Sequence, residues 1–296
     1  MCAFRVTERS ISTNVMTGLQ SNISRLADLQ SKLSNGKDVS RASDSPGGAV
    51  MAMQYRGDIA NFKQFSRNAA DGLGWLSVAD NALTSSMDQV SRAQELVLSG
   101  LSSGSGGSSQ SHEAIALEID NIREAMLGLA NSTYLDRPVF GGTTPKDFAF
   151  NPDGTYAGNG GKVERQGSAN SAVRVDTKAT DVFGSGTQQI FTVLAQISTD
   201  LRTNPAGLTA DLAALNTSSD LLQSGLSSVG ARYNQLQALQ QNADAAVTDL
   251  TSQVSDVEDI DLPKTITELT LQQTAYQAAL AATARIVQPS LVDFLR

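Results

Sequence analysis

Residues 208–257 carry apolar side chains at alternating steps of four and three positions, without a slip. Fifteen positions fall in this series and twelve of them are Leu, Val or Tyr: Leu208, Leu212, Leu215, Ser219, Leu222, Leu226, Val229, Tyr233, Leu236, Gln240, Ala243, Val247, Leu250, Val254 and Val257. A repeat averaging 3.5 residues places them on one stripe of a helix, which then meets partner helices along a left-handed seam. About fifty residues at about 1.5 Å each predict a rod roughly 75 Å long.

A second series with the same step runs through Tyr55, Ile59, Phe62, Ser66, Ala69, Leu73, Leu76, Asp80, Leu83, Met87, Val90, Gln94, Val97 and Leu101. Two rods of matched length are expected to lie side by side. Shorter series near the two ends predict helices there as well: Met16, Leu19, Ile23, Leu26 and Leu33, then Leu262, Ile266, Leu269, Tyr276, Leu280 and Val287. The expected fold class is mainly α, a long antiparallel coiled-coil bundle formed by the N- and C-terminal segments.

Two joints interrupt the expected helices. Asn35-Gly36 and Ser43-Asp44-Ser45-Pro46 close the first helix and open the second, because Ser or Asp caps free amides and Pro fits a first helical turn. Pro263 follows an acidic cluster, where it starts a new helix; the cluster is Asp256, Glu258, Asp259 and Asp261. The second joint, near residue 260, is expected to face the first across the fold.

The middle of the chain has a different composition. Residues 102–111 are nearly all Ser and Gly and predict a flexible turn. From Pro138 onward, glycines, a turn at 151–154 and alternating patterns near residues 163–165 and 172–176 predict a small central β insert. We therefore expect three domains: a terminal coiled-coil assembly domain (1–45 with 261–296), a helical rod domain (46–137 with 186–260) and a small outer β domain (138–185).

Composition narrows the possible partners. Aromatic residues make up only 5% of the 296 residues, so a thick globular core is hard to fill. The net charge is −8 and no run of Lys or Arg exceeds a pair, which argues against nucleic acid and anionic membranes. Polar residues interrupt every apolar stretch in residues 1–20, so we expect no secretory signal and no membrane span. Cys2, the single cysteine, is read as an incidental free thiol.

The residues that often carry catalysis are sparse and scattered. His112 is the only histidine, which excludes a His-based triad and a zinc site of several histidines; at a helix start it is expected on the surface. Trp75 is expected in the core. Asn159-Gly160-Gly161 lacks the spacing of a phosphate-binding loop and predicts a tight turn. We expect no enzyme activity, no catalytic residues, no metal and no cofactor.

The acidic cluster before Pro263 is the remaining candidate for a cation site. Its four carboxylates lack the loop spacing and the glycine of a calcium loop. The sequence therefore predicts a solvated helix end there.

The terminal helices are too weakly apolar to be stable alone. One heptad buries about two large side chains, worth roughly 1.5–3 kcal/mol each, whereas ordering its seven residues costs on the order of 1–2 kcal/mol per residue. Many seam entries are small or polar, among them Gln30, Gln273 and Thr283. We hypothesise that residues 1–40 and 264–296 order only when neighbouring copies supply further surface.

Several motifs carry a resemblance to a known family. Arg5-Val6-Thr7, the stretch Lys32–Lys37, Ser43–Pro46, Arg67-Asn68 with Asp71-Gly72, and the tail Ser290–Arg296 resemble the bacterial flagellin superfamily. The central stretches Arg137–Thr143, Tyr156–Gly161 with Glu164-Arg165, and Val182–Gly184 are similar to its hook-associated members. Two departures are Asp44-Ser45-Pro46, where the family usually has Asp-Asp-Pro, and three extra residues before the usual start.

The resemblance implies a structural subunit of the extracellular flagellum, exported unfolded by the flagellar type III apparatus with a chaperone on its C-terminal helix. It implies a ring of subunits at the hook-filament junction, between a hook-side junction protein and flagellin. The expected assembly residues are Met16, Leu19, Ile23, Leu26, Leu33, Leu269, Tyr276, Leu280 and Val287, with Leu291, Phe294 and Leu295 as the closing contact. The alternatives are a filament subunit and, from another class, a helical adaptor or signalling rod.

Overall fold

The computed structural model describes residues 8–103 and 109–293, with side chains described from 13 to 102 and from 109 to 284. The chain divides into two compact units. Unit 1 comprises residues 1–60 and 248–296, and unit 2 comprises residues 61–247. Two long helices, α2 (Pro46–Ser103) and α6 (Leu208–Glu258), contribute to both units.

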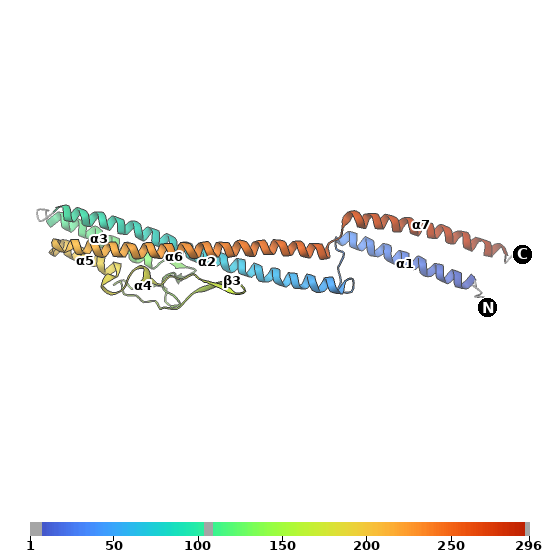
Figure 1. The fold of residues 1–296 in the computed structure, drawn as a ribbon, viewed down its shortest axis with the longest axis horizontal. Helices are drawn as coiled ribbons and strands as arrows, with labels where there is room; N and C mark the ends of the chain where they lie inside the picture. Colours follow the sequence, from blue (N-terminus) through green and yellow to red (C-terminus); the bar gives the residue numbers. More distant parts are fainter. Residues whose placement is uncertain (1–7, 104–108, 294–296) are drawn as a thin grey trace. The chain divides into compact units, whose positions relative to one another are not determined.

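Unit 2 is built from parts of α2 and α6 together with α3 (Ser109–Ala130) and α5 (Ile190–Thr203) (Figure 1). The mainly-α prediction is confirmed, and α6 begins at the first residue of the predicted late rod. Every member of the early apolar series is buried or half-buried, and in the late series only Tyr233 is exposed, at 37%. The four-three spacing therefore identified the packed stripe of both long helices.

Helix α3 packs antiparallel on α5. Ser198 lies against the Ala116 carbonyl, and Arg202 forms ion pairs with Glu113 and Asp120. His112 lies one turn before Ala116 on the inward stripe of α3 and is only 7% exposed, so the predicted surface position is wrong. Its polar neighbours in sequence suggested exposure, but the packing of α5 decides which stripe of α3 is covered.

The β structure consists of two antiparallel hairpins. In the first, β1 (Thr133–Tyr134) pairs with β2 (Arg137–Pro138). In the second, β3 (Glu164–Ser168) pairs with β4 (Ser171–Arg174), with Glu164 opposite Arg174. Strands are thus confirmed near the predicted 163–165 and 172–176, although β4 ends at Arg174, before Asp176. Short helical turns follow: α4 (Ala179–Val182), η2 (Gly186–Gln188) and η3 (Pro205–Gly207).

Phenylalanines concentrate where the irregular segment 139–163 meets α5. Phe150 lies edge-on to Phe183 and Phe191, with ring centroids 5.6 and 5.0 Å away, and Phe140 lies 5.1 Å from Phe183. Asn131 holds this segment in place, because its side chain accepts bonds from the amides of Ala149 and Phe150 and donates to the Phe150 carbonyl. Phe140, Phe150, Tyr156, Phe183 and Phe191 therefore form one compact aromatic core in unit 2.

Trp75 is 1% exposed, which confirms the predicted core position. Its ring contacts Tyr134 edge-on at 5.9 Å, and the guanidinium groups of Arg137 and Arg165 lie 5.6 and 6.0 Å from its centroid. Arg165 also donates to Asp71 at 2.5 Å. Cation-π contacts and this ion pair fasten both hairpins to α2.

The three-domain division stays a prediction. Residues of the 138–185 segment, such as Val139, Val173 and Phe183, belong to the same buried cluster as residues of α2, α3, α5 and α6. Within the described residues, no helix is long and apolar enough to cross a membrane.

The β1–β2 turn contains two residues in the left-handed region, Leu135 at φ 49° and Asp136 at φ 60°. Such two-residue turns favour Asn-Gly, and Leu135 is 74% exposed, so it gains little packing in return. Replacing Leu135-Asp136 by Asn-Gly is expected to stabilise unit 2 by about 1 kcal/mol, which raises its melting temperature by about 2–4 °C. Circular dichroism melting checks this, and an unchanged or lower melting temperature contradicts it.

Two buried carboxyl groups face each other between α5 and α6. Asp200 is 9% exposed and Asp211 is 8% exposed. Burial, reinforced by the charge of Asp200, raises the pKa of Asp211 to about 6. The folded chain therefore binds a proton that the unfolded chain releases between about pH 4 and 6, and stability falls as pH rises through that window.

Asp211→Asn is expected to stabilise unit 2 by on the order of 1 kcal/mol at pH 7.5, because the amide removes the repulsion between the two carboxylates. Thermal melts between pH 4.5 and 7.5 check this, and the variant should lose most of the decline above pH 5. Asp220→Asn, at an exposed position of the same helix, is the matched control. A decline that persists unchanged in Asp211→Asn rules out this carboxyl pair as its source.

Candidate assembly interface

In unit 1, α1 (Glu8–Asn35) and α7 (Leu262–Asp293) lie side by side and antiparallel (Figure 1). Their half-buried or buried positions repeat at steps of four and three on both helices. On α1 these are Val15, Leu19, Asn22, Leu26, Leu29 and Leu33, and on α7 they are Thr265, Leu269, Gln272, Tyr276, Ala279 and Thr283. We call these twelve positions the internal seam.

The structure divides the predicted assembly residues into two groups. Five lie in the internal seam, half-buried against the chain's own partner helix: Leu19, Leu26, Leu33, Leu269 and Tyr276. Three point to solvent, with exposed fractions of 62% for Met16, 50% for Ile23 and 44% for Leu280. Val287 and Leu291 lie on α7 beyond the described side chains, and Phe294 and Leu295 lie outside the described residues.

We call residues that lie seven positions apart on one helix a column. Each terminal helix thus has two adjacent columns, either of which could complete a seam of four-three spacing. The internal seam and the predicted series share one column on each helix, which includes Leu19 and Leu26 on α1 and Leu269 and Tyr276 on α7. The second column of the internal seam differs from the prediction: it consists of Val15, Asn22 and Leu29 on α1 and of Thr265, Gln272 and Ala279 on α7. The column left outside holds Met16, Ile23, Ile266 and Leu280, which are 44–62% exposed. Polar Asn22 and Thr265 are covered, whereas Ile23 and Ile266, one position further along each helix, are each 50% exposed.

Sequence reasoning missed this column because it favoured the larger apolar residues: it chose Met16 and Ile23 over Val15 and Asn22, and Ile266 and Leu280 over Thr265 and Ala279. The signal was present, since Thr265, Gln272 and Ala279 keep the same four-three step as Leu269 and Tyr276. Leu271 was missed as well and is 70% exposed. It lines a shallow hollow of about 310 Å³ between α1 and α7, together with Arg25, Asp28, Leu29, Glu268 and Gln272.

The two units differ sharply in apolar burial. Among the side chains described in unit 1, Ala52 is the one buried apolar residue, and the large hydrophobic cluster lies wholly in unit 2. Among the same described side chains, nine large apolar ones are exposed: Met16, Ile23, Val50, Met51, Met53, Leu262, Ile266, Leu271 and Leu280. Unit 1 is therefore the candidate for an assembly surface, since contiguous exposed apolar patches are typical of protein interfaces.

The two joints are bonded to each other. The amides of Asp38 and Val39 donate to the Glu258 carbonyl, and the Ile260 amide donates to the Gly36 carbonyl. Gly36 has φ 68°, a conformation that favours glycine after a helix. The predicted juxtaposition of the joints is confirmed, and it sets where α1 and α7 begin their contact.

Side-chain charges reinforce this contact. Glu258, 5% exposed, accepts from Arg56 at 2.7 Å and from Lys37 at 3.4 Å, so the predicted solvated helix end is wrong for this residue. Burial is tolerated because Lys37 from the other joint and Arg56 from α2 neutralise the carboxylate. Lys37 also donates a hydrogen bond to Asp259 Oδ1. This bond lowers the pKa of Asp259 and raises the pKa of Lys37.

Capping residues define the helix starts at the joints. Ser45 Oγ accepts from the Gly48 amide at 3.2 Å, and Asp261 Oδ1 accepts from the Lys264 amide at 3.1 Å. Asp44 accepts from the Arg41 amide at 2.8 Å, which lowers the pKa of its carboxyl group. The cap predicted for Ser45 is confirmed, so the departure from the usual Asp-Asp-Pro leaves the start of α2 intact.

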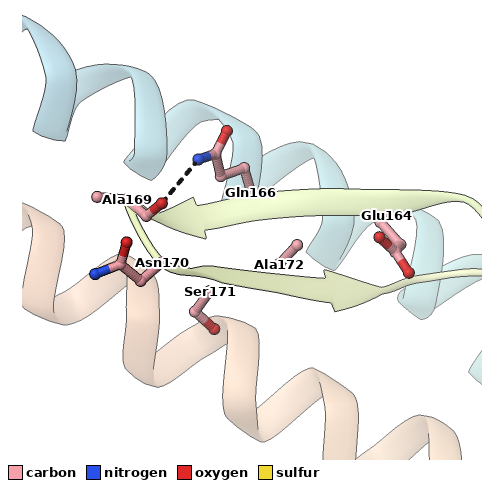
Figure 2. A pocket seen from close by; sticks show the side chains of 6 residues that line it. All are labelled: Glu164, Gln166, Ala169, Asn170, Ser171 and Ala172. Atoms are coloured by element: carbon pink, nitrogen blue, oxygen red, sulfur yellow. Dashed lines mark hydrogen bonds between the residues drawn. The ribbon is translucent and has the colours of Figure 1, made fainter.

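A hollow of about 380 Å³ lies on the β3–β4 hairpin in unit 2 (Figure 2). Gln166 donates across it to the Ala169 carbonyl, and Asn170, Ser171 and Ala172 line the remaining sides. Glu164 is its single charged side chain. Ser171 and Glu164 lie at opposite ends of the hairpin, since Ser171 pairs with Ser168 and Glu164 with Arg174, so the hydroxyl and the carboxylate do not form a nucleophile-base pair.

Two family models match the chain. The bacterial flagellin N-terminal helical region matches residues 6–138, and the bacterial flagellin C-terminal helical region matches residues 212–295. A flagellin of Bacillus subtilis (strain 168) is 25% identical over 300 residues, covering 96% of each chain. Flagellar hook-associated protein 3 of Escherichia coli (strain K12) is 25% identical over 293 residues, covering 90% of this chain and 92% of that protein.

Solved structures share the fold. FlgL from Bacillus cereus, at 21% identity, superimposes with a TM-score of 0.60 over 68% of this chain and 99% of its own. The flagellar junction protein FlgL from Legionella pneumophila, at 14% identity, gives a TM-score of 0.56 over 72% of this chain and 100% of its own.

Proposed function

Because the chain belongs to the bacterial flagellin family, we propose that it is a structural subunit of the flagellum that joins the hook to the filament. In this proposal α1 and α7 of neighbouring copies pack together into a ring. The observation that carries it is the outward column of Met16, Ile23, Ile266 and Leu280, left uncovered while more polar residues fill the internal seam. The chain performs no chemistry in this role.

A junction subunit meets different neighbours on its two sides. We propose a hook-side junction protein below, flagellin above and further copies of this chain beside it. Before assembly, an export chaperone would hold the C-terminal helix of the unfolded chain, which then leaves the cell through the flagellar type III apparatus. Specificity between these neighbours lies in how well the helix faces match.

A filament subunit is the second candidate, since the Bacillus subtilis flagellin matches the chain along 96% of its length. Support for the junction role comes from the FlgL structures, which this fold covers nearly completely. The two candidates differ in what they build. Purified protein that grows into micrometre-long filaments without other components would favour the filament subunit.

Deletion of the gene followed by electron microscopy tests the proposal. The junction role predicts cells that carry hooks without filaments and that lose flagellin to the medium, and the wild-type gene should restore filaments. Normal filaments in the deletion strain would overturn the proposal.

A further inference from the structure

A hydrogen-bonded polar pair interrupts the internal seam near its middle. Gln272 Nε2 donates to Asn22 Oδ1 at 3.1 Å, and both side chains are half-buried. Leu19 and Leu26 flank Asn22 on α1, and Leu269 and Tyr276 flank Gln272 on α7. Leucine at either polar position would bury more apolar surface, so apolar burial does not explain why these two residues are polar.

The rest of the seam discriminates poorly between alignments of the two helices. Thr265, Ala279 and Thr283 are small and accept almost any partner, so moving α7 by one heptad costs little apolar contact. In such a shifted alignment Asn22 would face Thr265 or Ala279, and Gln272 would face Val15 or Leu29. Buried amides without their partners are penalised, which is how a single polar layer fixes the register of coiled coils.

Register determines the surface that a neighbour meets. One heptad at about 1.5 Å per residue moves α7 by roughly 10 Å along α1. In the native alignment, with Asn22 opposite Gln272, Leu280 lies near the level of Met16. With Asn22 opposite Ala279 it would lie near the level of Ile23, so the outward face would carry a different pattern of exposed apolar residues. A second copy can match this face only if the alignment is unique.

We propose that Asn22 and Gln272 form a register lock, which fixes the alignment of α1 and α7 that a second copy of this chain recognises. The inference rests on the proposed assembly of terminal helices and adds the residues that determine its specificity. With Asn22 and Gln272 the α1–α7 pair is less stable than it would be with leucine at both positions, but only one outward face forms.

Asn22→Leu/Gln272→Leu tests the lock. The double variant is expected to keep at least the wild-type helix content and melting temperature, yet to enter flagella at least tenfold less efficiently when it replaces the wild-type gene. The reversed pair, Asn22→Gln/Gln272→Asn, keeps a donor and an acceptor and should retain at least half of the wild-type level. Normal incorporation of the leucine variant, or a loss of its stability, would overturn the inference.

Cysteine cross-linking reports the register directly. The experiment uses a Cys2→Ser background and sulfate buffer, because sulfate favours apolar burial. A disulfide between Leu26→Cys and Leu269→Cys reports the native register. A disulfide between Leu26→Cys and Tyr276→Cys reports a one-heptad shift. The wild-type seam should form only the native link, whereas the leucine variant should form both. Native links alone in both seams would overturn the lock.

The outcomes separate this inference from the proposed function. If wild-type chain enters flagella and the leucine variant does so equally well, the lock fails and the junction role stands. If the wild-type chain itself never enters flagella, both fail.

Discussion

Leu280→Asp is expected to abolish incorporation of the chain into flagella while unit 2 stays folded. Leu280 is 44% exposed on α7, in the column that the internal seam leaves uncovered. A carboxylate placed in an apolar contact between copies must be desolvated without a partner, which costs several kcal/mol and prevents stable packing. Immunoblots of purified flagella measure incorporation, and near-ultraviolet circular dichroism of the secreted chain reports the fold of unit 2.

Leu117→Asp is the matched control for Leu280→Asp. Leu117 is a leucine of similar exposure, 53%, but it lies on α3 in unit 2. The same change of charge there should leave incorporation close to the wild-type level. Normal junctions built from Leu280→Asp would mean that the outward column is not an assembly surface.

Phe150→Ala is expected to destabilise unit 2 by about 3–5 kcal/mol, because it empties a site at the centre of the aromatic core. The ring is 2% exposed and contacts Tyr156, Phe183 and Phe191 with centroids 5.0–5.6 Å apart. For a unit of this size the loss corresponds to a fall in melting temperature of roughly 10 °C. Calorimetry of the purified chain measures it directly.

Phe148 provides the comparison two residues away. It is 38% exposed and contacts Lys146 through its ring face. Phe148→Ala should cost less than about 1 kcal/mol, since little buried volume is lost. Equal destabilisation by the two substitutions would show that Phe150 does not occupy a tightly packed core.

The long helices could be predicted from sequence because their signal is periodic and local. Leu208 begins both the predicted late rod and α6, and Pro46 begins α2 as its position after Ser45 suggested. Every apolar residue of such a series indicates the same buried stripe of the helix, so a single exposed member such as Tyr233 does not weaken the prediction.

The terminal interface was harder to predict because each end offers two columns with the same spacing. Leu19 and Leu26 belong to both possible seams, so spacing alone does not decide whether Asn22 or Ile23 turns inward. That choice depends on the facing helix, where Gln272 provides the partner for Asn22. Long-range contacts of this kind leave no local pattern.

The burial of Glu258 and His112 escaped prediction for a related reason. Lys37, which neutralises Glu258, is 221 positions away in the chain. The helix that covers α3 near His112 begins only at Ile190. The polar neighbours of Glu258 and His112 in the sequence suggested that both side chains are exposed to solvent. Segments that are distant in the sequence cover them instead.

Amide hydrogen exchange, compared between the monomer and assembled flagella, tests the central claim that the terminal helices gain order from neighbouring copies. We expect amides of α1 and α7 to exchange at least about a hundredfold more slowly in the assembly, whereas α3, α5 and the unit 2 part of α6 are protected in both states. Equal, strong protection of α1 and α7 in the dilute monomer and in the assembly would contradict the account.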